Sequence, residues 1–167
     1  MDFDLIERTF RDLALAAGRD ILAIYDSGAL GTRAKADESP VTLADLAADR
    51  VISEGLRAAF PDLPLVTEEQ AATHAAQART FLIVDPLDGT KEFVRRRADF
   101  TVNIALVEEG RPVRGVVYAP ARERLFYTDA AGRAVEEEGP FGPRPGPLRP
   151  LHVRRPDNDA LTVVASK

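Results

Sequence analysis

At 167 residues, with 45% hydrophobic and 29% charged residues, the chain has the size and composition of one globular domain that buries a core without disulfides. It has no cysteine and two histidines, His74 and His152, which excludes thiolate-bound metals, thiol nucleophiles and three-histidine sites. The net charge of −5 argues against a nucleic-acid partner, because nucleic-acid binding requires a basic surface.

The acidic N-terminus is unlike a signal peptide, and no apolar run reaches the length of a membrane span. We therefore expect a cytoplasmic protein without a membrane-spanning segment. From Phe3 to Ser27, apolar residues recur at helical spacing and Gly28 follows as a stop signal. This pattern predicts a long amphipathic helix that packs on the core.

Residues 29–40 have the composition of a loop, which carries Lys35. Thr42 and Asp45 then have the spacing of a capping box, and apolar residues at helical spacing continue to Phe60. A second helix is predicted. From the residues alone Asp45 is a helix cap, and a functional role for it stays open.

The short apolar segment Leu65–Thr67 predicts a strand that ends at Glu68 and Glu69. Adjacent acids are usually solvated, but at a strand exit they raise each other's proton affinity unless a cation lies nearby. The residues between 70 and 80 predict a loop or short helix in which His74 is exposed.

The apolar run from Phe81 to Val84 predicts a buried strand that stops before Pro86, which places two aspartates at the strand end. Asp85, the Leu87 carbonyl and Asp88 supply the oxygen ligands that Mg²⁺ prefers. Gly89 and Thr90 would open a following turn whose backbone N–H groups can accept an anion. The alternative is a strand followed by an ordinary Asp-Gly turn.

Arginines 95–97 form either a solvated surface or an anion-steering patch. Beyond them, alternating and apolar runs separated by turn signals predict two hairpins. Their four strands cover residues 101–107, 113–118, 124–128 and 133–137. With the preceding helices, they predict an α+β fold in which long helices pack on a large, mainly antiparallel sheet.

The segment from Gly139 to Pro150 is so rich in proline and glycine that we expect a linker without regular structure. A further strand is expected over Leu161–Ala165. The predicted organisation is a domain over residues 1–138, a linker over 139–150 and the start of a C-terminal domain over 151–167.

The run from Asp85 to Phe93, D-P-L-D-G-T-K-E-F, resembles the metal and phosphate loop of the inositol monophosphatase superfamily of magnesium-dependent phosphatases. Its Lys91-Glu92-Phe93 ending is similar to the CysQ-type 3'(2'),5'-bisphosphate nucleotidases, and the resemblance extends from about Lys35 to Tyr127. It implies a layered sugar-phosphatase-like fold. Members continue for about another small domain, which carries a Trp-Asp element; this chain has no tryptophan, so we expect an N-terminal part or a truncation.

The resemblance implies two or three Mg²⁺ ions, with Glu68, Asp85, Leu87 and Asp88 as ligands. Glu68, Thr90 and Asp45 would be catalytic, with Asp45 bonding Thr90. Glu68 matches the family's ligating glutamate although Thr67 precedes it where the family has serine or glycine, and Glu69 is expected to face outward or to support the site.

On the same resemblance, Glu68, Leu87, Asp88, Gly89 and Thr90 would bind a small phosphorylated substrate. Adenosine 3',5'-bisphosphate would be hydrolysed to AMP and phosphate in sulfate assimilation. Two alternatives stay open: an inositol or sugar monophosphatase, and an inactive metal- or phosphate-binding fragment. A homodimer is compatible with the resemblance.

Overall fold

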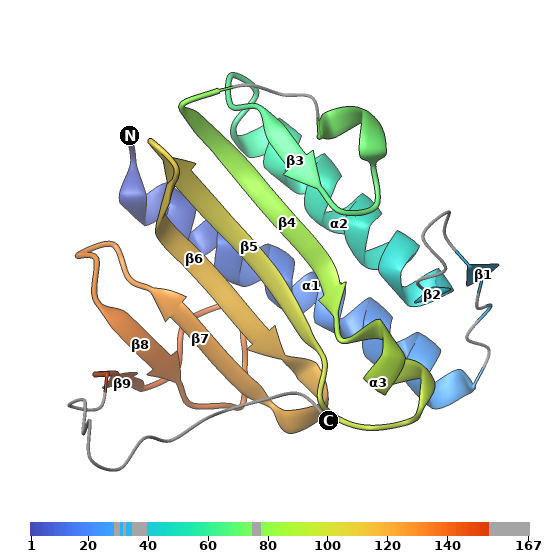
Figure 1. The fold of residues 1–167 in the computed structure, drawn as a ribbon. Helices are drawn as coiled ribbons and strands as arrows, with labels where there is room; N and C mark the ends of the chain where they lie inside the picture. Colours follow the sequence, from blue (N-terminus) through green and yellow to red (C-terminus); the bar gives the residue numbers. More distant parts are fainter. Residues whose placement is uncertain (29–30, 32, 35–39, 75–77, 154–167) are drawn as a thin grey trace, which may run out of the picture.

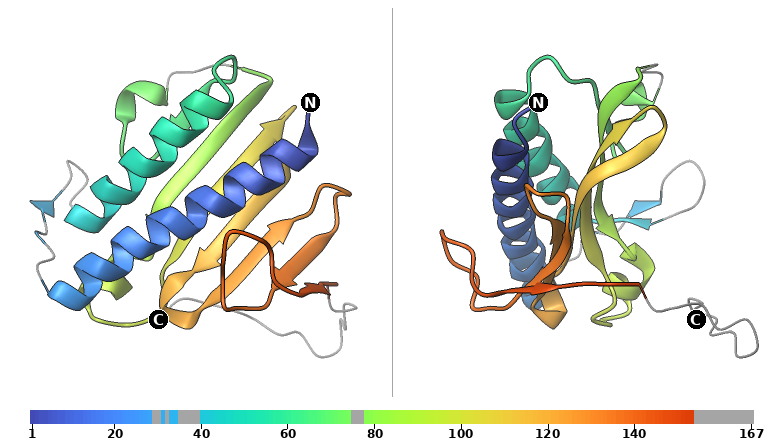
Figure 2. Two further views of the ribbon diagram at one scale, coloured as in Figure 1. Left: turned by 180° about the vertical axis from the view of Figure 1, so that it is seen from behind. Right: turned by 90° about the vertical axis from the view of Figure 1, so that its left-hand side faces the viewer.

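The computed structural model describes residues 1–28, 31, 33–34, 40–74 and 78–153. Its main element is a seven-stranded sheet with two long helices packed side by side on one face (Figures 1 and 2). The edge-on view in Figure 2 shows one helical layer and one sheet layer, so the predicted α+β class is confirmed. None of the described helices combines the length and the apolar character needed to cross a membrane.

The two helices begin and end where local sequence signals predicted. Helix α1 (Phe3–Ser27) starts at Asp2, whose carboxylate accepts a hydrogen bond from Leu5 N at 3.0 Å, and ends at Gly28 in the left-handed conformation. Helix α2 (Leu43–Ala59) starts with the predicted capping box between Thr42 and Asp45. Each helix buries its apolar stripe against the sheet, which accounts for the amphipathic patterns.

The sheet has the order β3-β4-β5-β6-β7-β8-β9, with β3 and β4 parallel and every later pair antiparallel. The strands are β3 (Leu65–Thr67), β4 (Thr80–Asp88), β5 (Thr101–Glu108), β6 (Arg111–Ala119), β7 (Arg124–Thr128), β8 (Ala134–Glu137) and β9 (Leu148–Pro150). The short elements are β1 (Arg33–Ala34), β2 (Pro40–Val41), η1 (Ala71–Thr73), α3 (Thr90–Val94) and η2 (Pro120–Arg122). Both predicted hairpins are present as β5–β6 and β7–β8.

Two expectations about the strands are wrong. Strand β4 does not stop before Pro86 but continues to Asp88 through a bulge. Residues 148–150, expected to be irregular, pair with β8 as β9, because an edge strand tolerates proline where its N–H would face away from the neighbour. The domain boundaries stay a prediction, and Lys35 and the expected strand over 161–165 lie outside the described residues.

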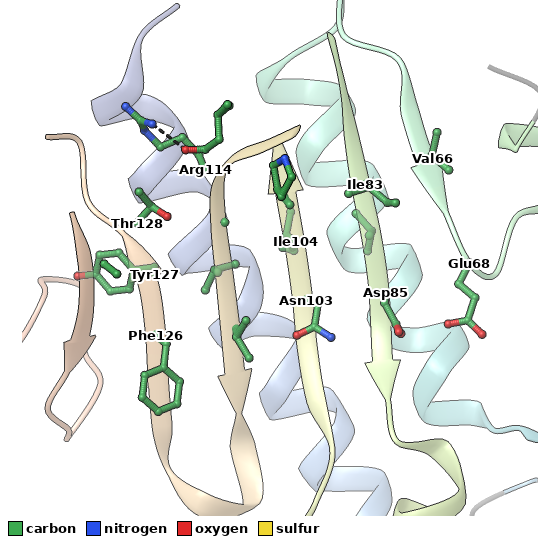
Figure 3. A pocket seen from close by; sticks show the side chains of 18 of the residues that line it. Val66, Glu68, Ile83, Asp85, Asn103, Ile104, Arg114, Phe126, Tyr127 and Thr128 are labelled. Atoms are coloured by element: carbon green, nitrogen blue, oxygen red, sulfur yellow. Dashed lines mark hydrogen bonds between the residues drawn. The ribbon is translucent and has the colours of Figure 1, made fainter. Parts of the chain in front are cut away.

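The long helices cover one face of the sheet and leave the other face open. Leu82, Val84, Ile104 and Val116 face the helices and are at most 2% exposed. On the opposite face Ile83 is 42% and Val117 43% exposed, and no described element covers them (Figure 2). The run from Phe81 to Val84 is therefore not buried on both faces as expected. This open face includes a groove of about 700 Å³ (Figure 3).

Candidate metal and phosphate site

A bulge in β4 places both aspartates of the loop on the open face of the sheet. Asp85 pairs with Asn103 and Asp88 pairs with Thr101, so β4 has one residue more than β5 over this stretch. In a regular strand, residues three apart point to opposite faces. The extra residue restores the alternation and leaves Leu87, 1% exposed, in the core between the two acids.

Glu68 and Asp85 meet where β3 ends beside β4. Thr67 of β3 pairs with Val84 of β4, and Glu68 N donates to Val84 O at 3.1 Å, so the next residue of each strand lies at the same level. Figure 3 shows the two carboxylates directed toward each other. Glu68 is exposed and Glu69 half-buried, so of the two alternatives for Glu69 the burial does not favour the outward-facing one.

The surroundings of Asp85 disfavour its charge. Burial raises the pKa of Asp85 to about 7, together with the charges of Glu68 and Asp88 and a hydrogen bond to Glu68. A backbone hydrogen bond at Leu87 opposes this only in part. Asp85 Oδ1 is buried and has no hydrogen-bond partner among the described residues. Two converging carboxylates and an oxygen without a donor are the chemistry that a divalent cation would satisfy.

Thr90 connects the loop to helix α2. Its Oγ1 lies 3.1 Å from Asp45 Oδ1 and 3.1 Å from the Leu87 carbonyl. The other oxygen of Asp45 accepts hydrogen bonds from Thr42 N at 2.8 Å and Thr42 Oγ1 at 2.5 Å. Asp45 therefore serves as helix cap and as partner of Thr90 at once, so the two roles left open in the sequence coexist.

Gly89 is required by its backbone conformation and by space. Its φ is +91°, and an added Cβ would lie 2.6 Å from Asp99 O. Gly89 caps α3, which has only five residues. The turn therefore brings backbone N–H groups beside Asp88 without a long helix behind them.

The oxygen atoms at this site are of the kind that a hard cation binds, but the described side chains do not make up a complete set of metal ligands. No group of three or more His, Asp or Glu side chains within the described ranges is placed to hold a metal ion. The structure brings Glu68 and Asp85 together, while Asp88 acts on Asp85 through its charge. The oxygen ligands available are thus these two carboxylates, neighbouring Asp88 and the Leu87 carbonyl.

Residues of the candidate site line two different cavities. Glu68 and Asp85 line the groove on the open face, and Asp88 and Gly89 line a second pocket of about 620 Å³ that also includes Arg97. The arginines of the basic run have partners within the chain. Arg95 and Arg97 bond Glu92 at 3.3 and 2.9 Å, and Arg96 donates to the Tyr25 carbonyl at the end of α1. These contacts favour a structural surface over an anion-steering patch.

The sequence did not reveal two further features near the site. Asp49, one helical turn after Asp45, accepts hydrogen bonds from Thr67 Oγ1 and from Gln70 Nε2, the latter at 2.7 Å. His74 is exposed as expected, but its Nε2 lies 2.9 Å from Thr67 O. The spacing of Asp45 and Asp49 on one helical face was the available signal for the first feature.

Comparison with known proteins supports the resemblance. Residues 4–166 match the model of the inositol monophosphatase family. The 3'(2'),5'-bisphosphate nucleotidase CysQ of Salmonella typhimurium is 48% identical over 129 residues, which are 75% of this chain and 52% of that protein. The corresponding protein of Buchnera aphidicola is 38% identical over 77% of this chain and 53% of its own length. The chain thus spans about half the length of these relatives.

The crystal structure of CysQ from Bacteroides thetaiotaomicron superposes with a TM-score of 0.67 and 38% identity, covering 82% of this chain and 50% of that one. The structural similarity and the family match over nearly the whole sequence agree. The chain belongs to the inositol monophosphatase family.

Proposed function

We propose that this chain carries the metal-binding part of a Mg²⁺-dependent phosphomonoesterase that hydrolyses adenosine 3',5'-bisphosphate to AMP and phosphate. The observation that carries the proposal is the meeting of Glu68 with Asp85, whose Oδ1 has no hydrogen-bond partner among the described residues. Two acids that oppose each other's ionisation at a strand end are disfavoured unless a cation accompanies them.

Glu68, Asp85, the Leu87 carbonyl and Asp88 are the proposed metal ligands, for two or three ions. Bound there, Mg²⁺ would supply Lewis-acid stabilisation of phosphoryl charge and would lower the pKa of a water molecule. The phosphate group would be contacted by Glu68, Leu87, Asp88, Gly89 and Thr90. The Gly89 and Thr90 amides are suited to its equatorial oxygens because they donate hydrogen bonds without adding charge.

Thr90, Asp45 and Glu68 are the proposed catalytic groups. When Thr90 donates a hydrogen bond to Asp45 Oδ1, its hydroxyl oxygen can still accept a hydrogen bond from the attacking water, which orients that water. The exposed Glu68 carboxylate can accept the water's other proton as its oxygen attacks phosphorus, while the ester P–O bond breaks and the departing sugar oxygen takes up a proton from solvent. Asp45 would hold the hydroxyl in place through this hydrogen bond.

The choice of substrate rests on the relatives. CysQ of Salmonella typhimurium is a 3'(2'),5'-bisphosphate nucleotidase by name, and this chain has the Lys91-Glu92 ending of that type. An inositol monophosphate is the second candidate, because the matching family model is that of inositol monophosphatases. A cytoplasmic enzyme of sulfate assimilation, with a homodimer as its assembly, completes the proposal.

Two measurements test it. Calorimetric titration of the chain with Mg²⁺ should give heat that Asp88→Asn reduces strongly; equal titrations would mean that the loop is not a metal site. Phosphate release by the complete gene product, compared on adenosine 3',5'-bisphosphate and inositol monophosphate, should favour the nucleotide. Activity on the inositol ester alone would reverse the substrate assignment, and binding of Mg²⁺ without turnover of either would identify an inactive module.

A further inference from the structure

Asp49 connects helix α2 to both ends of the turn that carries Glu68. The turn follows β3 and is closed by Gln70 N, which donates to Thr67 O at 3.3 Å. Asp49 Oδ1 accepts from Thr67 Oγ1, and Oδ2 accepts from Gln70 Nε2 at 2.7 Å. The residue before the two glutamates and the residue after them are therefore held by one carboxylate.

The network around Asp49 is buried and leaves little freedom. Asp49 is 6%, Ser53 1% and Thr67 0% exposed. Ser53 Oγ lies 3.3 Å from Asp49 Oδ1 and 3.3 Å from Gln70 Nε2, and Gln70 Oε1 accepts from Arg57 at 2.8 Å. The Gln70 amide is thus fixed at both ends. Breaking such a network leaves buried donors without acceptors, which costs more than the bonds themselves contribute.

Helix α2 holds the two acidic segments of the site with carboxylates one turn apart. Asp45 bonds Thr90 in the loop of Asp85 and Asp88, while Asp49 bonds the turn of Glu68. Because one rigid helix carries both carboxylates, it sets where the Glu68 turn stands relative to the loop. The paired residues of β3 and β4 end at Thr67 and Val84, and the last backbone bond between the two segments runs from Glu68 N to Val84 O, so Glu68 lies at the end of this pairing.

We propose that Asp49 is a positioning residue that fixes the Glu68 turn against the Asp85 loop in the geometry needed for a shared divalent ion. The metal part of this inference rests on the proposed function. The fixing of the turn does not, because it can be measured without any metal. Asp49 itself contacts neither ion nor substrate; it acts through Thr67 and Gln70.

Hydrogen exchange without metal tests the first part. The Glu68 amide donates to Val84 O and the Gln70 amide to Thr67 O, whereas the Leu82 amide, bonded to Pro64 O at 2.8 Å, is an internal reference. Asp49→Ala should raise exchange at Glu68 and Gln70 about tenfold relative to Leu82. Asp49→Asn, which keeps one acceptor oxygen, should fall between. Unchanged exchange at Glu68 and Gln70 would overturn the inference.

Mg²⁺ titration by calorimetry tests the second part. Asp49→Ala should weaken binding about tenfold or more, as expected when support of a ligand is lost. Ile52→Val, a core change on the same helix, is the control because it lowers stability without removing a hydrogen bond to the turn. If Ile52→Val weakens binding as much as Asp49→Ala, the effect is general destabilisation and the positioning role is wrong.

Thr67→Val covers the case in which Asp49→Ala does not fold. It removes one hydroxyl and keeps the β-branched shape at a buried position. It should loosen the Glu68 turn and weaken Mg²⁺ binding in the same direction. If wild type binds no Mg²⁺, the proposed function fails, and the exchange data alone then decide whether Asp49 fixes the turn.

Discussion

Asp85 in the candidate site and Glu137 beneath α1 are both withdrawn from solvent, but their surroundings treat negative charge in opposite ways. Glu137 accepts two hydrogen bonds of 2.6 Å from the Arg11 guanidinium, one from Gly146 N at 3.0 Å and one from Tyr127 at 3.2 Å. Burial alone would raise the pKa of Glu137, but the bonds from Arg11 and Gly146 outweigh it and hold that pKa below its usual range. Asp85 instead faces two other acids.

The difference separates a carboxylate that maintains the fold from one that needs a ligand. Every feature that lowers the cost of charge on Glu137 is supplied by the chain, from α1, β7 and the segment after β8. At Asp85 the described residues supply burial and repulsion, and they leave Oδ1 without a hydrogen-bond donor. Perturbed acids of the second kind are typical of functional sites.

The largest expected effect comes from removing the counterion of Glu137. Arg11→Met leaves a buried carboxylate without its counterion and should lower the free energy of unfolding by about 3–5 kcal/mol. Urea denaturation followed by circular dichroism measures it. The double variant Arg11→Met/Glu137→Leu should recover most of the loss, because no buried charge remains. A double variant as unstable as the single one would show that packing of Arg11, and not its charge, matters.

Neutralising Asp85 should instead raise the free energy of unfolding when no metal is present. Its raised pKa means that the folded chain binds this proton more tightly than the unfolded chain, so the fold loses stability as the pH rises from the ordinary aspartate pKa to about 7. Asp85→Asn should therefore raise the free energy of unfolding at pH 8 by about 1–2 kcal/mol, after allowance for solvent screening at the groove. The gain should vanish near pH 4, and the same variant should no longer be stabilised by Mg²⁺.

The pH dependence of the wild-type chain should contain both effects. The contribution of Glu137 is complete above its ordinary pKa and is lost as the pH falls through its lowered pKa in the folded state. The cost of Asp85 grows as the pH rises from its ordinary pKa toward about 7. Without metal, stability should be maximal at mildly acidic pH and should decline by about 1 kcal/mol toward pH 8. A scan of melting temperature in EDTA checks this, and Asp85→Asn should remove the decline.

The smallest effect is expected at an ion pair that is exposed. Arg79 lies 3.3 Å from Glu109, but the two side chains are 86% and 66% exposed. Arg79→Ala should change the free energy of unfolding by no more than about 0.5 kcal/mol. The contrast with Arg11→Met, measured by the same denaturation, would assign the large effect to burial and not to pairing as such.

Signals within a few residues of one another were enough to predict much of the molecule. The stop at Gly28, the capping box of Thr42 and Asp45 and the alternation in β5 to β8 all depend on neighbours in sequence. The approach of Glu68 to Asp85 followed from both lying at strand ends, with the family resemblance to join them. Their roles as ligands stay a prediction.

Features that depend on distant residues were not predictable from spacing. The Arg11–Glu137 pair joins positions 126 residues apart, and nothing local distinguishes Glu137 from the two glutamates beside it. The exposure of one face of the sheet was not predictable either. An apolar run predicts a buried strand, but it does not tell which face of the sheet the helices cover. The bulge at Pro86 was missed because proline ordinarily ends a strand, whereas a bulge leaves its missing N–H without consequence.

The additional residue in β4 bears on how far this loop can vary in length. A shortened Asp-Pro-Asp loop would still show both acids on one side, since alternate residues of a regular strand share a face. It would lose the Leu87 side chain, which packs in the core, and the Leu87 carbonyl, which lies 3.1 Å from Thr90 Oγ1. A one-residue deletion here would thus pass a search for acidic residues while removing the buried Leu87 side chain and a proposed oxygen ligand together.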